Sequence, residues 1–346
     1  MSKLVYKNTK YRYVNHCTNG CWEIGFMTEN PNVILNEAAG VLQYAQTCFE
    51  GMKAYRRYDG DISIVEITKH YTRFCKSAKA IGIPEFGYKM FKDAICEVVR
   101  MNASEIPNVG DMLYIRPVIF SSEALLGIRP AMDHELRIFC SPIGNILEEN
   151  IQKKTNALKL LVSPFDRAAV NGSGRLKIGA NYAVSMRAIQ YAKDMGYDEC
   201  LYLDPKYQSY IEESSGANII FVDKDNTILV AEGTASLDGT VKQLIYKLVK
   251  DSKVNEISLR RLELMDVSEA KECYLIGTAV EVTPVALIDD KRYADRRIEF
   301  ADTKEGFGTI GQQLAQSLED LYLGKVEDEA LSLTVISDKF YHTDEF

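Results

Sequence analysis

The chain has 346 residues and a formal net charge of −8, with 46% hydrophobic and 26% charged residues. These proportions are those of a soluble globular protein, and the length suits about two domains. A negative net charge disfavours nucleic acid and anionic membrane surfaces as partners, because both attract basic proteins. The sequence contains no apolar run of about 18 residues for a membrane span and no signal peptide near residue 1. We therefore expect a cytoplasmic protein.

Eight cysteines and four histidines bear on redox state and metal binding. The cysteines are spread from Cys17 to Cys273 without dense spacing, which favours reduced thiols in a cytosolic protein. Cys17 and Cys21 lie beside His16, but no second pair of metal ligands follows. Because a zinc site needs about four such ligands, we expect no metal centre.

In the first half, the spacing of apolar residues predicts two helices and then a strand. The stretch KHYTRFCKSAKAIG predicts a helix capped by Thr68. In MFKDAICEVVRM the apolar residues form one helical stripe, which comprises Phe91, Ala94, Ile95, Val98 and Val99. The run MLYIRPVIF, residues 112–120, predicts a strand in which Tyr114 and Arg116 share one face. The polar stretch 144–156 is the predicted linker between two domains.

The second half continues the alternation of strands and helices, which is typical of an α/β or α+β fold. LKLLVSP predicts a strand, and DECLYLD, NIIFVD and NTILV predict short strands of a meander. GTVKQLIYKLVKD predicts a helix capped by Asp238 or Thr240. CYLIGTAVEVTPV predicts a strand ending in Gly277-Thr278-Ala279. The last predicted helix carries Ile310, Leu314, Leu318 and Leu321.

Lys177 lies between Leu176 and Ile178, after several glycines and before a stretch with helical spacing. A lysine kept out of water has a lowered pKa and is a nucleophile suited to Schiff-base chemistry. Most lysines are exposed, however, and a strand with an outward lysine between inward apolar residues explains the pattern equally well. The nearby glycines match neither a dinucleotide-binding loop nor a P-loop. The local sequence leaves both interpretations of Lys177 open.

Three charged residues also have a structural and a functional interpretation. Glu212 and Glu213 end a predicted strand and point to opposite faces. One of them could hold a cofactor ring nitrogen protonated, or both could lie in a solvated turn. Arg116 needs a carboxylate partner if it is buried, and that partner could belong to the protein or to a substrate.

Two stretches could bind a phosphate group. LDGTVKQ brings a glycine turn to a helix N-terminus, where free N–H groups and the helix dipole favour an anion. Gly277-Thr278-Ala279 offers further backbone donors and one hydroxyl. Arg73 could add positive charge, although it is equally typical of an exposed helix residue.

Six stretches together resemble the branched-chain amino acid aminotransferases, which are fold-type IV enzymes that use pyridoxal 5′-phosphate (PLP). They follow the family's order and are YAQTCFEGMKAYR, LYIRPVIF, LGIRP, RAAVNGSGRLKIGANYA, YIEESSGANIIFV and GTAVEVTPV. The resemblance implies a two-domain mixed α/β fold. A smaller N-terminal α/β domain is expected over residues 1–143, a linker over 144–156, and a larger PLP-binding domain with mixed sheets over 157–346.

The resemblance also implies roles at the cofactor. Lys177 is similar to the lysine that forms the internal aldimine with PLP and then moves the Cα proton. Glu213 corresponds to the carboxylate at the pyridine nitrogen, and Tyr182 to the tyrosine at the ring hydroxyl. The residues expected to bind the phosphate are Arg73, Thr278, Gly239, Thr240 and Val241.

Substrate-binding roles follow from the same resemblance. Tyr114 and Arg116 correspond to a pair that handles substrate carboxylates, and the backbone of Thr278 and Ala279 would bind the α-carboxylate. Aromatic residues expected to line the side-chain pocket are Tyr44 and Phe49. The implied reaction is ping-pong transamination between Leu, Ile or Val and 2-oxoglutarate, and the implied assembly is a homodimer.

Two alternatives stay open. A D-amino acid aminotransferase or an aminodeoxychorismate lyase-like enzyme would keep the fold and the cofactor but change the substrate. The stretches LYIRP and GTAVEVTP favour the branched-chain group. A cofactor-free binding protein that has lost catalysis is the third hypothesis, and the joint presence of Lys177, Tyr182 and Glu213 disfavours it.

Overall fold

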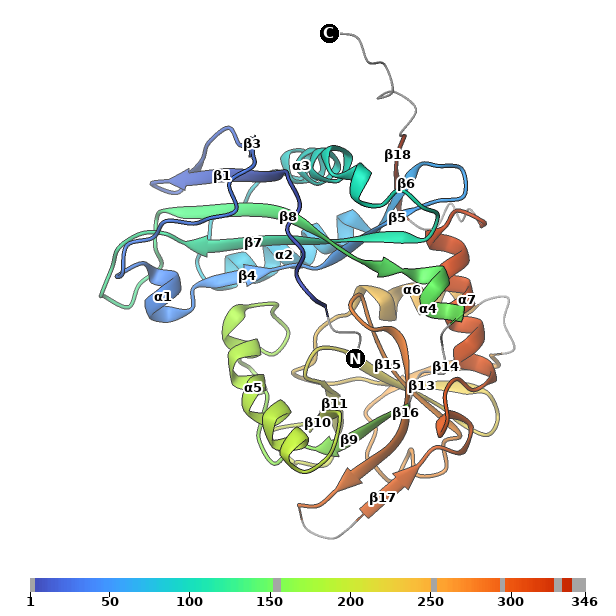
Figure 1. Ribbon diagram of the computed structural model, residues 1–346. Coiled ribbons are helices and arrows are strands. Elements are labelled where there is room, and N and C mark those ends of the chain that lie inside the picture. The colour runs from blue at the N-terminus through green and yellow to red at the C-terminus, as the bar shows by residue number, and fades with distance from the viewer. Residues whose placement is uncertain (1–3, 152–156, 250–253, 293–295, 327–331, 338–346) are drawn as a thin grey trace. The chain divides into compact units, whose positions relative to one another are not determined.

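The computed structural model of the protein describes residues 4–151, 157–249, 254–292, 296–326 and 332–337 (Figure 1). The chain divides into two compact units. The N-terminal unit comprises residues 4–151, the short segment 176–180 and the described chain after residue 318. The C-terminal unit comprises the described residues between 157 and 318 apart from 176–180. The prediction placed its boundary close to the division after Ile151, but it assigned 176–180 and the C-terminal segment to the other domain.

The N-terminal unit contains a sheet of nine strands in its described part, with the order β18-β6-β5-β7-β8-β1-β2. Strand β3 also pairs with β1, and β4 pairs with β7. The strands are β1 (Arg12–Thr18), β2 (Cys21–Trp22), β3 (Phe26–Thr28), β4 (Thr47–Phe49), β5 (Met52–Arg56), β6 (Ile62–Val65), β7 (Asp111–Ser121), β8 (His134–Asn145) and β18 (Leu333–Ile336). Helices α1 (Gly40–Tyr44), α2 (Ile67–Ala80), α3 (Tyr88–Met101) and α4 (Ile146–Ile151) complete the unit.

Alternation along the two long central strands separates a core face from a second face. Leu113, Ile115 and Ile119 of β7 and Leu136, Ile138 and Cys140 of β8 share a buried cluster with residues of α2 and α3. The predicted apolar stripe of α3 is buried in the same cluster, which confirms that helix. Because neighbouring residues of a strand point to opposite faces, Tyr114 and Arg116 lie on the face away from these helices.

Two predictions about this unit are wrong. Thr68 does not cap α2, which begins at Ile67 after Glu66, a residue with φ of +58°. The backbone N–H of Glu66 donates to the carbonyl of Ser332, so a tertiary contact holds the start of this helix. Residues 144–145 end strand β8, and the chain then enters α4, so the first half of the predicted linker is regular structure. Residues 152–156 of that linker lie outside the described residues.

The C-terminal unit contains a second sheet of nine strands in its described part, with the order β11-β10-β9-β16-β15-β12-β13-β14 and β17 beside β16. The strands are β9 (Leu158–Val162), β10 (Glu199–Leu203), β11 (Ile211–Ser214), β12 (Asn218–Val222), β13 (Thr227–Ala231), β14 (Glu256–Arg260), β15 (Glu272–Gly277), β16 (Glu281–Asp290) and β17 (Arg296–Glu299). Parallel pairs (β9 with β10 and β16, β13 with β14) and antiparallel pairs occur together. The sheet is therefore mixed, as expected.

Three helices belong wholly or partly to this unit: α5 (Gly179–Asp194), α6 (Thr240–Leu248) and α7 (Thr309–Tyr322). The four apolar residues predicted for the last helix are all buried on α7. Gly239, which makes no side-chain cap, precedes α6, so the predicted cap by Asp238 or Thr240 is wrong. Strands β10, β12 and β13 form as predicted, but β9, β16 and β15 lie between β10 and β12, so they are no simple meander. None of the helices in the described chain combines the length and apolar composition needed to cross a bilayer.

Candidate active site

Lys177 lies in an irregular segment directly before α5, and not in the strand that alternation suggested. Its backbone N–H donates to Oγ of Ser77 at 2.9 Å, and its carbonyl accepts from the N–H of Phe49 at 3.1 Å. The next residue, Ile178, bridges to Cys48 and is buried in the N-terminal core. Lys177 itself is half-buried, and its Nζ lies 4.9 Å from the centroid of the Phe49 ring. The flanking apolar residues thus anchor the backbone while the amine reaches an aromatic face.

A buried carboxylate holds the side chain of Arg73. Glu50 is fully buried and accepts from Nε of Arg73 at 2.7 Å, from Nη2 of Arg73 at 2.8 Å and from Nδ1 of His70 at 2.7 Å. Burial alone would raise the pKa of Glu50, but the charge of Arg73 and the hydrogen bonds from Arg73 and His70 hold that pKa well below its ordinary value. Burial lowers the pKa of His70. The guanidinium of Arg73 therefore has a fixed plane and direction.

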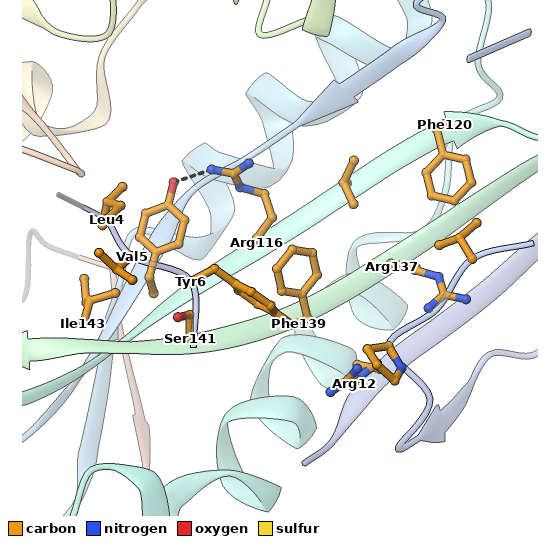
Figure 2. A pocket seen from close by; sticks show the side chains of 14 residues that line it. Leu4, Val5, Tyr6, Arg12, Arg116, Phe120, Arg137, Phe139, Ser141 and Ile143 are labelled. Atoms are coloured by element: carbon orange, nitrogen blue, oxygen red, sulfur yellow. Dashed lines mark hydrogen bonds between the residues drawn. The ribbon is translucent and has the colours of Figure 1, made fainter. Parts of the chain in front are cut away.

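Tyr114 and Arg116 line a pocket of about 510 Å³ on the face of β7 and β8 that points away from α2 and α3. Nη2 of Arg116 donates to Oη of Tyr114 at 3.0 Å, and Figure 2 shows this bond beside Tyr6 and Phe139. The guanidinium carbon of Arg116 lies 4.6 Å from the centroid of the Phe49 ring. Lys177 and Arg116 therefore both contact Phe49.

Arg116 has no carboxylate partner among the described residues. Its contacts there are the hydroxyl of Tyr114 and two aromatic rings, and its Nε is buried without a hydrogen-bond partner in the same part of the chain. An arginine in partly apolar surroundings ordinarily pairs with a carboxylate. Of the two interpretations left open by the sequence, an internal salt bridge is thus not observed in the described chain.

In the C-terminal unit, Glu212 and Glu213 are both buried, so a solvated acidic turn is excluded. Glu212 accepts from the N–H groups of Thr234 and Ala235 and is thereby structural. Glu213 accepts from Nδ2 of Asn218 and from the N–H of Leu237, each at 3.0 Å. Its Oε1 also lies 2.7 Å from Nη1 of Arg167. This buried ion pair allows Glu213 to stay ionised in an apolar setting.

The predicted phosphate-binding turn forms the N-terminus of α6. Gly239 is its N-cap, and a Cβ at this position would lie 2.0 Å from Oδ1 of Asn218. The hydroxyls of Thr240 and Thr278 approach to 3.5 Å. Thr240 and Val241 are buried, and Thr278 and Ala279 are half-buried in the turn between β15 and β16. Free N–H groups, a helix dipole and two hydroxyls suit an anion such as phosphate.

Comparisons with known proteins now bear on this arrangement. A family model described as amino-transferase class IV matches residues 47–288. The chain is 36% identical to branched-chain-amino-acid aminotransferase 5, chloroplastic, of Arabidopsis thaliana, over 93% of this chain and 76% of that protein. It is 29% identical to the branched-chain-amino-acid aminotransferase of Helicobacter pylori, over 93% of both chains. The chain belongs to the class IV aminotransferase family.

Solved structures agree with the family in fold. The branched-chain amino acid aminotransferase from Escherichia coli superposes with a TM-score of 0.75 at 25% identity, covering 93% of this chain and 97% of that one. A branched-chain amino acid aminotransferase of T.th., solved with pyridoxamine 5′-phosphate, superposes with a TM-score of 0.73 at 27% identity, covering 90% of this chain and 95% of that one. The protein is a PLP-dependent aminotransferase with the fold of this family, as the sequence predicted.

The residues present fit PLP. The family's cofactor has an aldehyde, a ring nitrogen and a phosphate. The chain offers an amine at Lys177, a buried carboxylate at Glu213, and cationic and N–H donors at Arg73 and at the start of α6. The close approach of Asn218 to Gly239 leaves no room for a Cβ there, as expected of a tight anion cradle. Within the described ranges, no three His, Cys, Asp or Glu side chains gather in a way that could hold a metal ion.

The predicted site residues fall in both units. Those in the N-terminal unit are Tyr44, Phe49, Arg73, Tyr114, Arg116 and Lys177, and those in the C-terminal unit are Tyr182, Glu213, Gly239, Thr240, Val241, Thr278 and Ala279. Within the first group, Phe49 joins Lys177 to Arg116. Tyr44 stands apart on α1, where it is exposed and donates to the carbonyl of Leu126.

Sequence reasoning missed several residues that hold this site. Glu50 and Ser77 contact Arg73 and Lys177, and Arg167 pairs with Glu213. Asn218 hydrogen-bonds Glu213, and Tyr6 lines the pocket of Arg116. Only Glu50 and Arg167 carry a sequence signal, as isolated charges within the family-like stretches. Ser77 and Tyr6 contact the site from distant sequence positions and give none.

Proposed function

We propose that the protein transfers amino groups between the branched-chain L-amino acids Leu, Ile and Val and 2-oxoglutarate. The observation that carries the substrate part of this proposal is Arg116, an arginine without a carboxylate partner in the described chain. It lines a largely apolar pocket and shares the Phe49 ring with the amine of Lys177. Apolar walls suit an aliphatic side chain, and a guanidinium suits a substrate carboxylate. The curated relatives named above are branched-chain aminotransferases by name, which supports the same substrates.

We assign the reaction's proton transfer to Lys177. When bound, PLP supplies an aldehyde that accepts an amino group and a ring that withdraws electrons from the neighbouring carbon. The Lys177 amine, released by the incoming substrate, takes the proton from the substrate Cα and returns it on the other side of the exchange. Phe49 beneath the amine excludes water from one side. A basic, partly desolvated amine is the group that this step requires.

Other residues of the chain hold the reactants in place. Glu213 keeps negative charge at the ring nitrogen, and its ion pair with Arg167 preserves that charge when the site is closed to water. Arg73 and the N–H groups of residues 239–241 bind the phosphate. Tyr182 donates to the ring hydroxyl. Since the amino acid donor leaves as a 2-oxo acid before the acceptor binds, we expect ping-pong kinetics.

The decisive experiment is an amino-donor panel with 2-oxoglutarate as acceptor that includes both enantiomers of each donor. Preference for L-Leu, L-Ile and L-Val supports the proposal. Preference for D-Ala would instead identify a D-amino acid aminotransferase, and cleavage of aminodeoxychorismate without transfer would identify a lyase. The Arg116→Met variant is the internal control: loss of one charge-assisted hydrogen bond predicts that kcat/KM for 2-oxoglutarate falls about 10- to 150-fold. An unchanged value would remove Arg116 from the substrate site.

The proposal includes association of two identical chains. On the N-terminal unit, Leu42 and Tyr44 of α1 are exposed, and so are Leu126 (76%) and Ile128 (93%). Exposed apolar residues that gather in this way are typical of protein interfaces, and the bond from Tyr44 to Leu126 brings the two segments together. Light scattering of the wild type should give twice the mass of the chain. The Leu126→Glu variant should shift this mass towards that of a monomer, and a monomeric wild type would contradict the proposal.

We also propose a cytoplasmic location. All eight cysteines are free thiols, which suits a reducing compartment. The Arabidopsis relative is chloroplastic by name, so organelles are the competing locations. Cell fractionation with a compartment marker decides: recovery of the protein with an organelle would contradict the proposal.

A further inference from the structure

Glu50, Ser77 and the residues that they contact form a closed circuit of bonds around Lys177. The N–H of Lys177 donates to Oγ of Ser77 at 2.9 Å, and that hydroxyl donates to the carbonyl of Arg73 at 3.0 Å. The guanidinium of Arg73 is bound by both oxygens of Glu50. Glu50 follows Phe49, whose N–H donates to the carbonyl of Lys177 at 3.1 Å. The circuit thus returns to the residue where it began.

All members of this circuit belong to the N-terminal unit. Arg73 and Ser77 are one turn apart on α2, so they lie on the same face of that helix. Ser77 and Glu50 are almost fully buried, at 1% and 0% exposure. Bonds between buried groups have few alternative partners, so the geometry of the circuit is rigid. It connects the backbone of the reactive lysine to the guanidinium of Arg73 through one helical turn.

We propose that Glu50 and Ser77 are positioning residues that preset the separation between the Lys177 amine and the Arg73 guanidinium before the cofactor binds. This inference rests on the proposed function, in which these two groups receive the aldehyde and the phosphate of one PLP molecule. Glu50 acts on the phosphate end, because it takes the Nε–Nη2 edge of Arg73 and so orients the rest of the guanidinium. Ser77 acts on the aldehyde end, because it holds the backbone from which the amine projects.

The two ends are separable by comparing PLP with pyridoxal, which has the aldehyde but lacks the phosphate. The full-length protein is freed of cofactor and titrated with each compound, and the dissociation constants are read from the visible absorbance of the bound form. Glu50→Asp keeps the charge but draws it back by one methylene. It should weaken PLP about 10-fold or more, the effect of one charge-assisted hydrogen bond, while pyridoxal binding changes less than about 3-fold.

Ser77→Ala should act differently, because it releases the backbone of Lys177. PLP and pyridoxal should both bind about 5- to 10-fold more weakly, as expected of a lost hydrogen bond of about 1 kcal/mol. The matched control is Thr72→Ala, on the same helix. The hydroxyl of Thr72 also donates to the carbonyl four residues earlier, that of Thr68, but it is exposed and lies outside the circuit. This control should bind both compounds like the wild type.

A purely structural role makes another prediction, so the outcomes are distinct. General loss of stability would weaken PLP and pyridoxal equally in Glu50→Asp, and that result would overturn the proposal for Glu50. Wild-type affinities in Ser77→Ala would overturn it for Ser77. In an Arg73→Met background, Glu50→Asp should no longer change the ratio of the two affinities, since the group that it positions is gone. Failure of the wild type to bind PLP would instead refute the proposed function itself.

Discussion

Replacing Gly51 with alanine tests how closely the chain beside Phe49 must approach Tyr114. A Cβ at Gly51 would lie 2.1 Å from Oη and 2.8 Å from Cζ of Tyr114. Carbon contacts are favourable only near 3.5–4.0 Å, so the tyrosine hydroxyl must move by more than about 1 Å. Its hydrogen bond from Arg116 is 3.0 Å long, and this displacement breaks it.

The magnitude has two parts. Overpacking of a buried position lowers the free energy of unfolding by about 1–3 kcal/mol. Loss of the charge-assisted bond, about 1.5–3 kcal/mol, predicts that kcat/KM for L-leucine falls about 10- to 150-fold if Tyr114 and Arg116 act together on the substrate carboxylate. PLP affinity should stay near the wild-type value, because neither residue belongs to the predicted phosphate site.

Urea unfolding and steady-state kinetics measure both parts, and Gly87→Ala is the matched control. A Cβ at Gly87 meets no atom of the described chain within 4 Å, so that variant should unfold and turn over like the wild type. Removing the nearest atom with Tyr114→Phe should reduce the stability penalty of Gly51→Ala, since the ring can then shift more easily. If Gly51→Ala matches Gly87→Ala in both assays, the close approach of Tyr114 is not required.

Three further outcomes are expected. Lys177→Ala should fold but should not be labelled when borohydride reduces the PLP-loaded protein, and mass spectrometry showing cofactor on the chain would contradict the role of the amine. Gly239→Ala forces Asn218 away from α6 and should weaken PLP about 10-fold, from about 1–3 kcal/mol of overpacking; unchanged affinity in a titration would argue against the cradle. Burial raises the pKa of the Glu199 carboxyl, so its contribution to stability is full below the ordinary pKa of about 4.3 and is lost as pH rises through the raised pKa. Glu199→Gln, which cannot ionise, should therefore become more stable relative to the wild type between about pH 4 and pH 7, and parallel urea midpoints would refute this.

Much of the fold was predictable because its signals are local. The stripe of α3 and the apolar residues of α7 recur at the helical period, and this pattern depends on neighbours within a few positions. Helix starts were not predictable in the same way. Ser332, from the end of the chain, bonds the backbone of Glu66 before α2, and the approach of Asn218 requires Gly239 before α6. Both starts are set by contacts between distant residues, so no local capping rule could find them.

By itself the sequence determined which chemical groups the site contains: an amine between apolar residues at Lys177, a carboxylate at Glu213 and an arginine at Arg116. Only the tertiary structure decided how each group is held. Ser77 is 100 residues from Lys177 in the chain and yet bonds its backbone, and Arg167 reaches Glu213 from outside its strand. Arg116 faces a pocket rather than an internal carboxylate. The physical reason is that residue types are written locally, whereas the partners that fix a charge or a backbone are chosen by packing over long separations.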